Sequence, residues 1–168
     1  MKWPIIRMQF YLYLLWLAFS PLSQNWAQEL KKYPAVQEVG KISREDWKKR
    51  LSPEEFHILW EKGTEKPYTG DLLHNEREGI YVTAGCGQPV FHSDQKYDSG
   101  TGWPSFWAPI TEDAIKLVND YSFFGIKRTE VVSSQCGEHL GHVFEDGPAP
   151  TGLRYCINSA ALDFIEDT

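Results

Sequence analysis

The stretch GLRYCIN, residues 152–158, holds one of only three cysteines in the chain, in the middle of a run that is typical of a β-strand. Side chains alternate between the two faces of a strand, so the apolar residues would face the core while Arg154, Cys156 and Asn158 share the other face. Cysteine is nucleophilic as the thiolate, and a nearby cation or hydrogen-bond donor favours that form. Cys156 is therefore a candidate nucleophile, although a buried, inert cysteine is the commoner outcome for such a pattern.

Two of the five histidines lie close together in GEHLGHVF, residues 137–144. A regular strand would send His139 and His142 to opposite faces, but Gly141 permits a turn or bulge that brings both imidazoles to one cavity. Histidine can donate or orient protons near neutral pH, which would suit a partner of a cysteine nucleophile. The alternative is a pair of loop histidines that are hydrogen-bonded to the backbone, and the spacing does not decide between the two.

Aromatic residues gather in KYDSGTGWPSFWAPI, residues 96–110, next to two glycines that flank Thr101. Trp103, Phe106 and Trp107 follow within a turn-rich segment. Such a cluster forms either a plug of the hydrophobic core or the wall of an apolar pocket.

The elements that must position these residues are mostly strands. Two short helices are expected at about 43–51 and 53–62, because each begins with a serine cap and acids follow in its first turn. Short apolar or alternating runs then predict strands at 79–84, 88–92, 114–119, 130–135, 142–144, 152–158 and 161–166. No helical segments separate these runs, so we expect a mainly β fold of two packed antiparallel sheets with short N-terminal helices.

The N-terminal segment has the pattern of an export signal. Two basic residues precede FYLYLLWLAF (10–19), an apolar run that is short for a membrane span but typical of a secretory signal peptide. We expect residues 1–27 to be a signal peptide that is cut after Ala27. An uncleaved N-terminal anchor is the alternative, because Asn25 is a poor residue two positions before the cut. The protein is accordingly expected to be exported, either periplasmic or secreted.

The rest of the chain divides into a linker or arm, residues 28–40, and one domain, residues 41–168. Without residues 1–27 the chain has 15 basic and 23 acidic residues, a net charge of −8. Phosphate contacts need clustered Lys and Arg, so nucleic acid is a poor partner for this chain. We expect an acidic monomer.

Four motifs share their order and spacing with a known enzyme family. They are KYDSGTGWPSF, HLGHVF, DGP-x-PTG and RYCINSAAL. With the upstream stretch WKKRLSPEEFHILWEKGTEKPYTG they closely resemble the B-type methionine sulfoxide reductases, over about residues 41–165. The resemblance implies that the domain is a methionine-R-sulfoxide reductase, an oxidoreductase of protein repair that responds to oxidative stress.

The resemblance also implies a role for each candidate residue. Cys156 matches the nucleophile that attacks the sulfoxide sulfur and becomes a sulfenic acid. The positions that match groups binding or protonating the sulfoxide oxygen are His139, His142 and Asn158. Arg154 matches the position credited with helping to form the thiolate. Trp103, with Phe106 beside it, matches the wall that holds the methyl group of the substrate.

One departure from the family concerns metal. Many members bind structural zinc through two C-x-x-C pairs, and the four corresponding positions here are Thr83, Cys86, Ser133 and Cys136. Two thiols with two hydroxyls are not a plausible tetrahedral zinc site, so we expect neither zinc nor another cofactor. Cys86 and Cys136 are expected either to form a disulfide or to remain neighbouring thiols, since the sequence does not fix the distance that a bond requires.

A second departure concerns recycling, because Thr101 stands where the family usually has its recycling cysteine. The sulfenic acid on Cys156 would then be resolved by Cys86 or Cys136 after a loop movement, or by an external thiol or a thioredoxin-like protein. We favour the external reductant. The alternative to an enzyme acting on oxidised proteins or peptides is a non-catalytic binding module that has kept the family scaffold.

Overall fold

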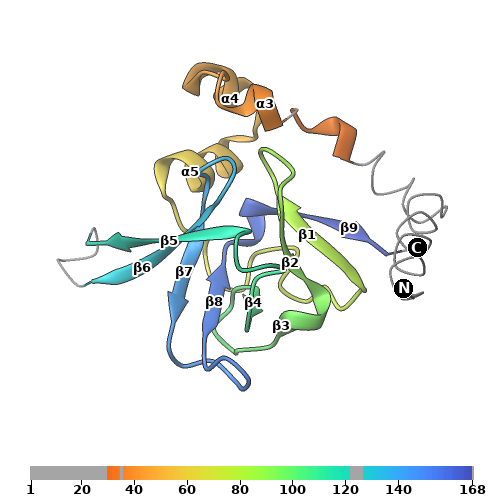
Figure 1. Cartoon of the computed structure of the whole chain (residues 1–168), viewed down its shortest axis with the longest axis vertical. Coiled ribbons are helices and arrows are strands. Elements are labelled where there is room, and N and C mark those ends of the chain that lie inside the picture. The colour runs from red at the N-terminus through yellow and green to blue at the C-terminus, as the bar shows by residue number, and fades with distance from the viewer. Residues whose placement is uncertain (1–29, 35, 122–126, 168) are drawn as a thin grey trace, which may run out of the picture.

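The computed structural model describes residues 30–34, 36–121 and 127–167 (Figure 1). The segment predicted to be a signal peptide or anchor, residues 1–27, lies outside the described residues, so this prediction stays untested. Among the helices of the described ranges, none is long and apolar enough to span a bilayer.

The helical elements precede the strands in the chain. They are the 3₁₀ turn η1 (Leu30–Lys32) and the helices α3 (Val36–Val39), α4 (Arg44–Arg50) and α5 (Pro53–Glu61). In α5 the Ser52 side chain accepts a hydrogen bond from the Glu55 amide and the Glu55 carboxylate accepts one from the Ser52 amide, so the start of the helix is fixed from both sides. Helix α5 ends at Lys62, which adopts a left-handed conformation with φ of 57°. The two helices predicted at 43–51 and 53–62 are thus present.

The strands follow the predicted runs closely. They are β1 (Gly79–Thr83), β2 (Pro89–His92), β3 (Lys96–Tyr97), β4 (Ser105–Phe106), β5 (Ile115–Asp120), β6 (Arg128–Ser133), β7 (His139–Phe144), β8 (Arg154–Ile157) and β9 (Leu162–Glu166), with 3₁₀ turns η2 (Ser93–Gln95) and η3 (Ser159–Ala161). Two-residue strands β3 and β4 were not predicted, because a run of two residues carries no alternation to recognise.

Two antiparallel sheets make up the body of the protein, as predicted (Figure 1). One has the strand order β2-β1-β9 and the other the order β3-β4-β8-β7-β6-β5. The main hydrophobic core contains residues from both sheets and from α5, including Tyr81, Phe91, Leu140, Ile157 and Leu59. The core therefore holds the inner face of β7 and β8 against the smaller sheet and the helix, and leaves their other face free for chemistry.

The prediction that Phe106 lines a substrate pocket is wrong. Phe106 is fully buried in the core, and its ring stacks on Phe91 with 4.4 Å between the ring centroids. The register explains this placement, because Phe106 pairs with the buried Tyr155 while Ser105 pairs with Cys156. Neighbours across a ladder share a face, so Phe106 points to the core side of the sheet.

Candidate active site

The alternation of β8 places Cys156 on the face opposite the core. Tyr155 and Ile157 are buried inward, whereas Cys156 is only partly buried and lies directly across the ladder from His142 of β7. Directly opposed residues of an antiparallel pair have neighbouring side chains, so the ladder itself brings the thiol and one imidazole together. Cys156 is the free cysteine among the described residues.

A pocket of about 150 Å³ opens beside this pair of residues. Its walls are formed by Thr64, Trp103, Arg128, Gly141, His142, Phe144, Cys156 and Asn158. Two larger hollows, of about 490 and 340 Å³, lie elsewhere on the described surface and include neither the free thiol nor a site histidine. Chemistry rather than size therefore singles out the smaller pocket, which collects four of the predicted residues.

The Cys156 thiol is not held as a thiolate by its surroundings. Burial raises its pKa above the ordinary value, and the charge of Arg154 and the Thr101 hydroxyl, 4.0 Å from the sulfur, offset this only in part. These polar neighbours favour the thiolate, but in the ligand-free protein desolvation outweighs them. At neutral pH the resting residue is a thiol that carries its proton.

Arg154 is itself held by an acid that the sequence analysis did not single out. Its Nε and Nη2 atoms each donate to one oxygen of Asp146, both at 2.9 Å, and its guanidinium carbon lies 4.4 Å from the centroid of the Phe144 ring. This paired arrangement fixes the plane of the guanidinium group. Arg154 does not line the pocket, so it acts on Cys156 through its charge rather than as part of the cavity wall.

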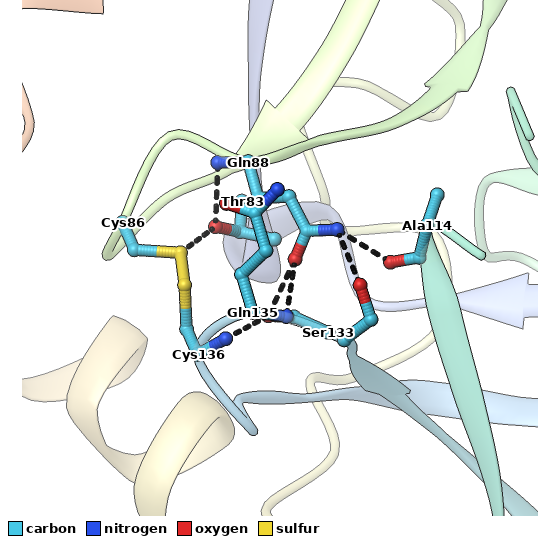
Figure 2. The surroundings of a disulfide bond; sticks show 8 residues. Thr83, Cys86, Gln88, Ala114, Ser133, Gln135 and Cys136 are labelled. Carbon is cyan, nitrogen blue, oxygen red and sulfur yellow. Dashed lines mark hydrogen bonds between the residues drawn. A yellow bond between two sulfur atoms is a disulfide. The ribbon is translucent and has the colours of Figure 1, made fainter. Parts of the chain in front are cut away.

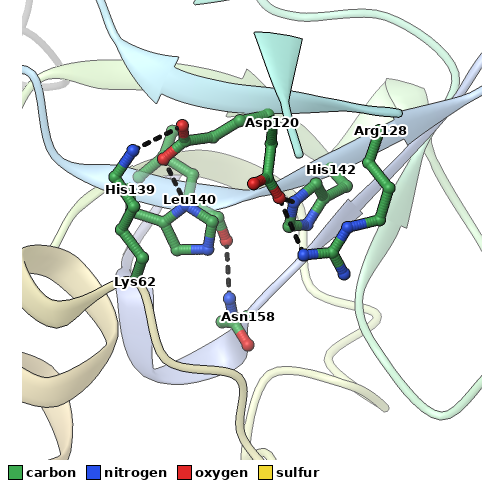
Figure 3. A network of polar contacts seen from close by, with 8 residues as sticks. Lys62, Asp120, Arg128, His139, Leu140, His142 and Asn158 are labelled. Carbon is green, nitrogen blue, oxygen red and sulfur yellow. Dashed lines mark hydrogen bonds and ion pairs between the residues drawn. The ribbon is translucent and has the colours of Figure 1, made fainter. Parts of the chain in front are cut away.

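His139, which Figure 3 shows beside Lys62 and Leu140, is buried and is not among the residues that line the pocket. Its Nδ1 is 2.8 Å from Glu130 Oε1, while Lys62 Nζ donates to Glu130 Oε2 at 2.8 Å. Burial raises the pKa of Glu130, but the bonds from Lys62 and His139 outweigh burial and leave the pKa below its usual value. Burial also lowers the pKa of His139, more than Glu130 raises it. The imidazole is therefore neutral, with its proton on Nδ1 and a lone pair on Nε2, which has no hydrogen-bond partner.

His142 has a carboxylate partner of its own. Its Nε2 lies 2.8 Å from Asp120 Oδ2, and the same oxygen accepts a bond of 2.7 Å from Arg128 Nη2 (Figure 3). The two imidazole rings approach edge to face with 5.4 Å between centroids. A carboxylate bonded to one ring nitrogen fixes the orientation and tautomer of the ring, as it does for metal-bound and catalytic histidines.

Neither of the two carboxylates that hold the histidines, Glu130 and Asp120, was predicted from the sequence. Glu130 is the first residue of the predicted strand 130–135, and Asp120 directly follows the predicted strand 114–119, so the signal available was an acidic residue at the end of a predicted strand. In the sheet order β7-β6-β5, β6 lies beside β7 and β5 lies on the other side of β6, and this long-range pairing brings the acids to the imidazoles.

Asn158 and Trp103 complete the pocket from two loops. The Asn158 side chain is buried, its Nδ2 donates to Leu140 O at 2.9 Å, and its Oδ1 accepts from the backbone amide of Glu65 at 3.1 Å. The Trp103 indole Nε1 donates to the backbone carbonyl of Glu65 at 3.2 Å. Trp103 is thus oriented with its apolar ring along the pocket, where it is suited to an apolar group of a ligand.

Comparison with known proteins agrees with the arrangement of these residues. The SelR domain family matches residues 51–166. A protein named "Peptide methionine sulfoxide reductase MsrB" from Methanosarcina barkeri is 56% identical over 129 residues, which are 77% of this chain and 90% of that protein. Proteins of the same name from Methanosarcina mazei and Leptospira interrogans are 58% and 57% identical, covering 74% and 77% of this chain and 89% and 98% of their own lengths. The chain belongs to the SelR family.

A disulfide closes the corner of this SelR domain that holds Thr83, Cys86, Ser133 and Cys136, the four positions that correspond to zinc ligands in other members of the family (Figure 2). Cys86, after β1, and Cys136, before β7, form a disulfide with 6.5 Å between their Cα atoms. This pairing is one of the two alternatives predicted for these cysteines.

The hydroxyls of Thr83 and Ser133, at the same corner as the disulfide, have hydrogen-bond partners as well. Thr83 Oγ1 lies 3.1 Å from Cys86 Sγ, and Ser133 Oγ donates to Gln88 Oε1 at 3.0 Å and accepts from the Cys136 amide at 3.0 Å. Gln88 Nε2 in turn donates to Ala114 O at 2.7 Å and to Ser134 Oγ at 2.9 Å. With the sulfurs bonded to each other and the hydroxyls engaged, these four residues do not offer four free ligands to a tetrahedral zinc ion, and the expected absence of zinc stays a prediction.

Proposed function

We propose that this protein reduces methionine-R-sulfoxide, in oxidised proteins or peptides, to methionine, with Cys156 as the nucleophile. Membership of the SelR family and the names of three relatives at 56–58% identity support the activity. The observation that carries the proposal is the pocket itself, which gathers a free thiol, an imidazole, a carboxamide and an indole around about 150 Å³.

The reaction balances without an added proton or metal ion. The thiol of Cys156 attacks the sulfoxide sulfur, the S=O bond breaks, and the oxygen ends on the cysteine sulfur as a sulfenic acid while methionine leaves. The substrate sulfur gains two electrons and the cysteine sulfur loses them. The thiol starts with one proton and the sulfenic acid ends with one, so the protein's task is to move that proton from sulfur to the departing oxygen.

The proposed roles follow from where the groups lie. His142 and Asn158 line the pocket and would bind the sulfoxide oxygen, and His139 would accept or relay a proton through its free Nε2. Trp103 would hold the terminal methyl group, because an apolar ring wall suits a group that cannot form hydrogen bonds. Arg154 would lower the cost of forming charge on Cys156 as the proton leaves.

Recycling is proposed to need an external dithiol or a thioredoxin-like protein. Thr101, whose hydroxyl lies 4.0 Å from Cys156 Sγ, cannot form a disulfide with it, and Cys86 and Cys136 are already bonded to each other. A sulfenic acid condenses readily with an incoming thiol, and a second thiol then releases the enzyme. We also propose that the chain acts as a monomer after export, with residues 1–27 removed or kept as an anchor.

The test is an assay of both epimers of a methionine sulfoxide peptide with dithiothreitol as reductant. Wild type should consume the R epimer alone, and Cys156→Ser should lower the rate by about three orders of magnitude or more. The matched control is the double variant Cys86→Ser/Cys136→Ser, which removes two sulfurs but leaves Cys156 and should keep the activity. Binding of the peptide by wild type without turnover would support a non-catalytic module instead.

A further inference from the structure

We infer that Glu65 is a positioning residue that holds two walls of the catalytic pocket, Asn158 and Trp103, at a fixed separation. This inference rests on the proposed function. Glu65 does not line the pocket itself and belongs to none of the groups assigned a chemical role above. It would act through the two residues that it contacts.

The backbone of Glu65 touches both walls. Its amide donates to Asn158 Oδ1 at 3.1 Å, and its carbonyl accepts from Trp103 Nε1 at 3.2 Å. One peptide segment therefore lies between the carboxamide that would bind the sulfoxide oxygen and the ring that would hold the methyl group. A shift of this segment would move the two contacts together, although the residues are 55 positions apart in the chain.

The carboxylate of Glu65 fixes that segment to the body of the protein. Its Oε1 accepts from the Ser159 amide at 2.7 Å and its Oε2 accepts from the Ala160 amide at 2.9 Å. These two amides directly follow Asn158 in the chain. The carboxylate of Glu65 therefore binds the turn at residues 159–160, and the backbone amide of Glu65 binds the side chain of Asn158 at the start of the same turn. The result is a closed ring of hydrogen bonds between Glu65 and residues 158–160.

Asn158 is held from its other side as well. Its Nδ2 and its backbone amide both donate to Leu140 O, each at 2.9 Å. With Oδ1 bound to Glu65, one hydrogen of the carboxamide and one lone pair of its oxygen are left for a ligand. Glu65 and Leu140 together therefore set which edge of the carboxamide faces the pocket.

The neighbouring residue Tyr68 ties the segment to the Trp103 loop. Its backbone amide donates to Gly102 O at 2.8 Å and its hydroxyl donates to Gly100 O at 2.7 Å. Tyr68 adopts a left-handed conformation with φ of 65°, which is uncommon outside glycine and is kept here by these two bonds. The segment is thus anchored at both ends, by a carboxylate at η3 and by Tyr68 at the loop.

The burial of the Glu65 carboxylate supports a positioning role for this residue. Glu65 is only 7% exposed. Burial raises its pKa even though the Ala160 and Ser159 amides lower it, so the charged form is disfavoured where it stands. A neutral residue of similar shape would avoid that cost, but only a carboxylate accepts two amides with two equivalent oxygens.

The test is Glu65→Gln, which keeps the volume but turns an NH₂ group toward one of the two amide donors. We expect kcat/KM for the R epimer to fall by about tenfold or more, while far-ultraviolet circular dichroism stays unchanged. The matched control is Glu54→Gln, an exposed acid on the hollow beside Glu65, which should keep wild-type kinetics.

A double-mutant cycle separates positioning from a general loss of stability. If Glu65 acts through its neighbour, Glu65→Gln should have little further effect in an Asn158→Ala background. The indole ¹⁵N–¹H resonance of Trp103, assigned by its absence in Trp103→Phe, should also shift in Glu65→Gln, because its acceptor has moved.

Three outcomes are decisive. Full activity in Glu65→Gln, or additive losses with Asn158→Ala together with an unmoved indole resonance, would overturn the inference. If Glu65→Gln does not fold, Glu65→Asp keeps the charge with a shorter reach and should show the same coupling and the same resonance shift. A wild type that lacks Cys156-dependent turnover would instead overturn the proposed function, which distinguishes the two failures.

Discussion

Two glutamates, Glu130 and Glu138, lie eight residues apart and are equally hidden from solvent, but their pKa values are shifted in opposite directions. Glu130 is 1% exposed and Glu138 is 0% exposed. Glu130 binds Lys62 and His139, and its pKa lies below the usual value. Burial raises the pKa of Glu138 to about 7, and the Thr83 hydroxyl and the Cys86 amide, which lower it, offset this only in part. The acid that binds His139 is thus ionised at neutral pH, whereas the acid at the disulfide corner is about half protonated there.

The sulfurs of the two regions differ in the same way. At the corner Cys86 and Cys136 are bonded to each other, and the hydroxyls and Gln88 around them are bonded among themselves (Figure 2). At the pocket Cys156 is free and the Nε2 of His139 has no partner. At the pocket, hydrogen bonds such as the one from His139 to Glu130 fix the side chains, while the Cys156 thiol and the His139 Nε2 atom keep the capacity to react or to bind a ligand. At the disulfide corner the sulfurs, the two hydroxyls and Gln88 are bonded to one another, although the Glu138 carboxylate is left without a hydrogen-bond partner among the described residues. Five variants test this contrast between the two regions.

The largest effect is expected from removing the disulfide. Cys86→Ser/Cys136→Ser should lower the free energy of unfolding by about 2–4 kcal/mol, because the bond links residues 50 positions apart and restricts the unfolded chain. Urea unfolding at pH 7, with and without a reductant for wild type, measures the loss. The reductase activity per folded molecule with dithiothreitol should change by less than about threefold. A collapse of activity with unchanged stability would place the corner in the catalytic cycle.

Local patterns in the sequence predicted the helices and the placement of the free cysteine. The alternation in RYCIN put Cys156 on the face away from Tyr155 and Ile157, and the serine-led starts gave both helices. These features depend on neighbours within a few residues, which is the range over which period and capping act.

The parts that were not predicted depend on pairing between distant strands. Glu130 meets His139 because β6 lies beside β7, and Phe106 points inward because β4 joins β8 in one register. The raised pKa of Cys156 is likewise a consequence of burial, which the polar neighbours in the sequence do not reveal. Long-range register and desolvation are the two quantities that a single sequence leaves open.

The second largest expected effect is a decrease in the free energy of unfolding with rising pH, caused by the burial of Glu138. Its pKa is about 7 in the folded protein and about 4.3 in an unfolded chain, so between these values the unfolded state binds fewer protons and stability falls as pH rises. Glu138→Gln should remove a penalty on the order of 3 kcal/mol that appears between about pH 4.5 and 7.5. Denaturant titrations of both proteins across this range measure the difference.

Glu130→Gln provides the control of opposite sign. The folded-state pKa of Glu130 is depressed, so its contribution is present above the unfolded pKa and is lost as pH falls through the folded pKa. The advantage of wild type over Glu130→Gln should therefore shrink toward acid pH. A stability difference that does not vary with pH in either pair would contradict the contrast between the two acids.

The same Glu130→Gln variant should be slower in catalysis at pH 7. The amide can no longer bind both Lys62 and His139 Nδ1–H as an anion, so the tautomer that leaves a lone pair on Nε2 loses its support. We expect kcat to fall by roughly 10²-fold, the range of a lost general acid–base contribution. Glu138→Gln is the matched control, an equally buried acid that should keep kcat. Equal losses in the two variants would show that burial, rather than contact with His139, governs the effect.

The smallest effect is expected at Arg154, whose charge partly offsets the burial of Cys156. Alkylation of the ligand-free protein by iodoacetamide at rising pH reports the thiolate fraction, since the disulfide protects the other two cysteines. Its midpoint should lie above that of an ordinary cysteine. In Arg154→Met it should lie higher still, with alkylation at pH 8 several times slower.

Asp146→Asn removes the acid that neutralises Arg154, and Asp146 itself raises the pKa of Cys156, so this variant should shift the midpoint downward. Opposite shifts in the two variants would establish that charge, and not the shape of the pocket wall, sets the reactivity of the sulfur.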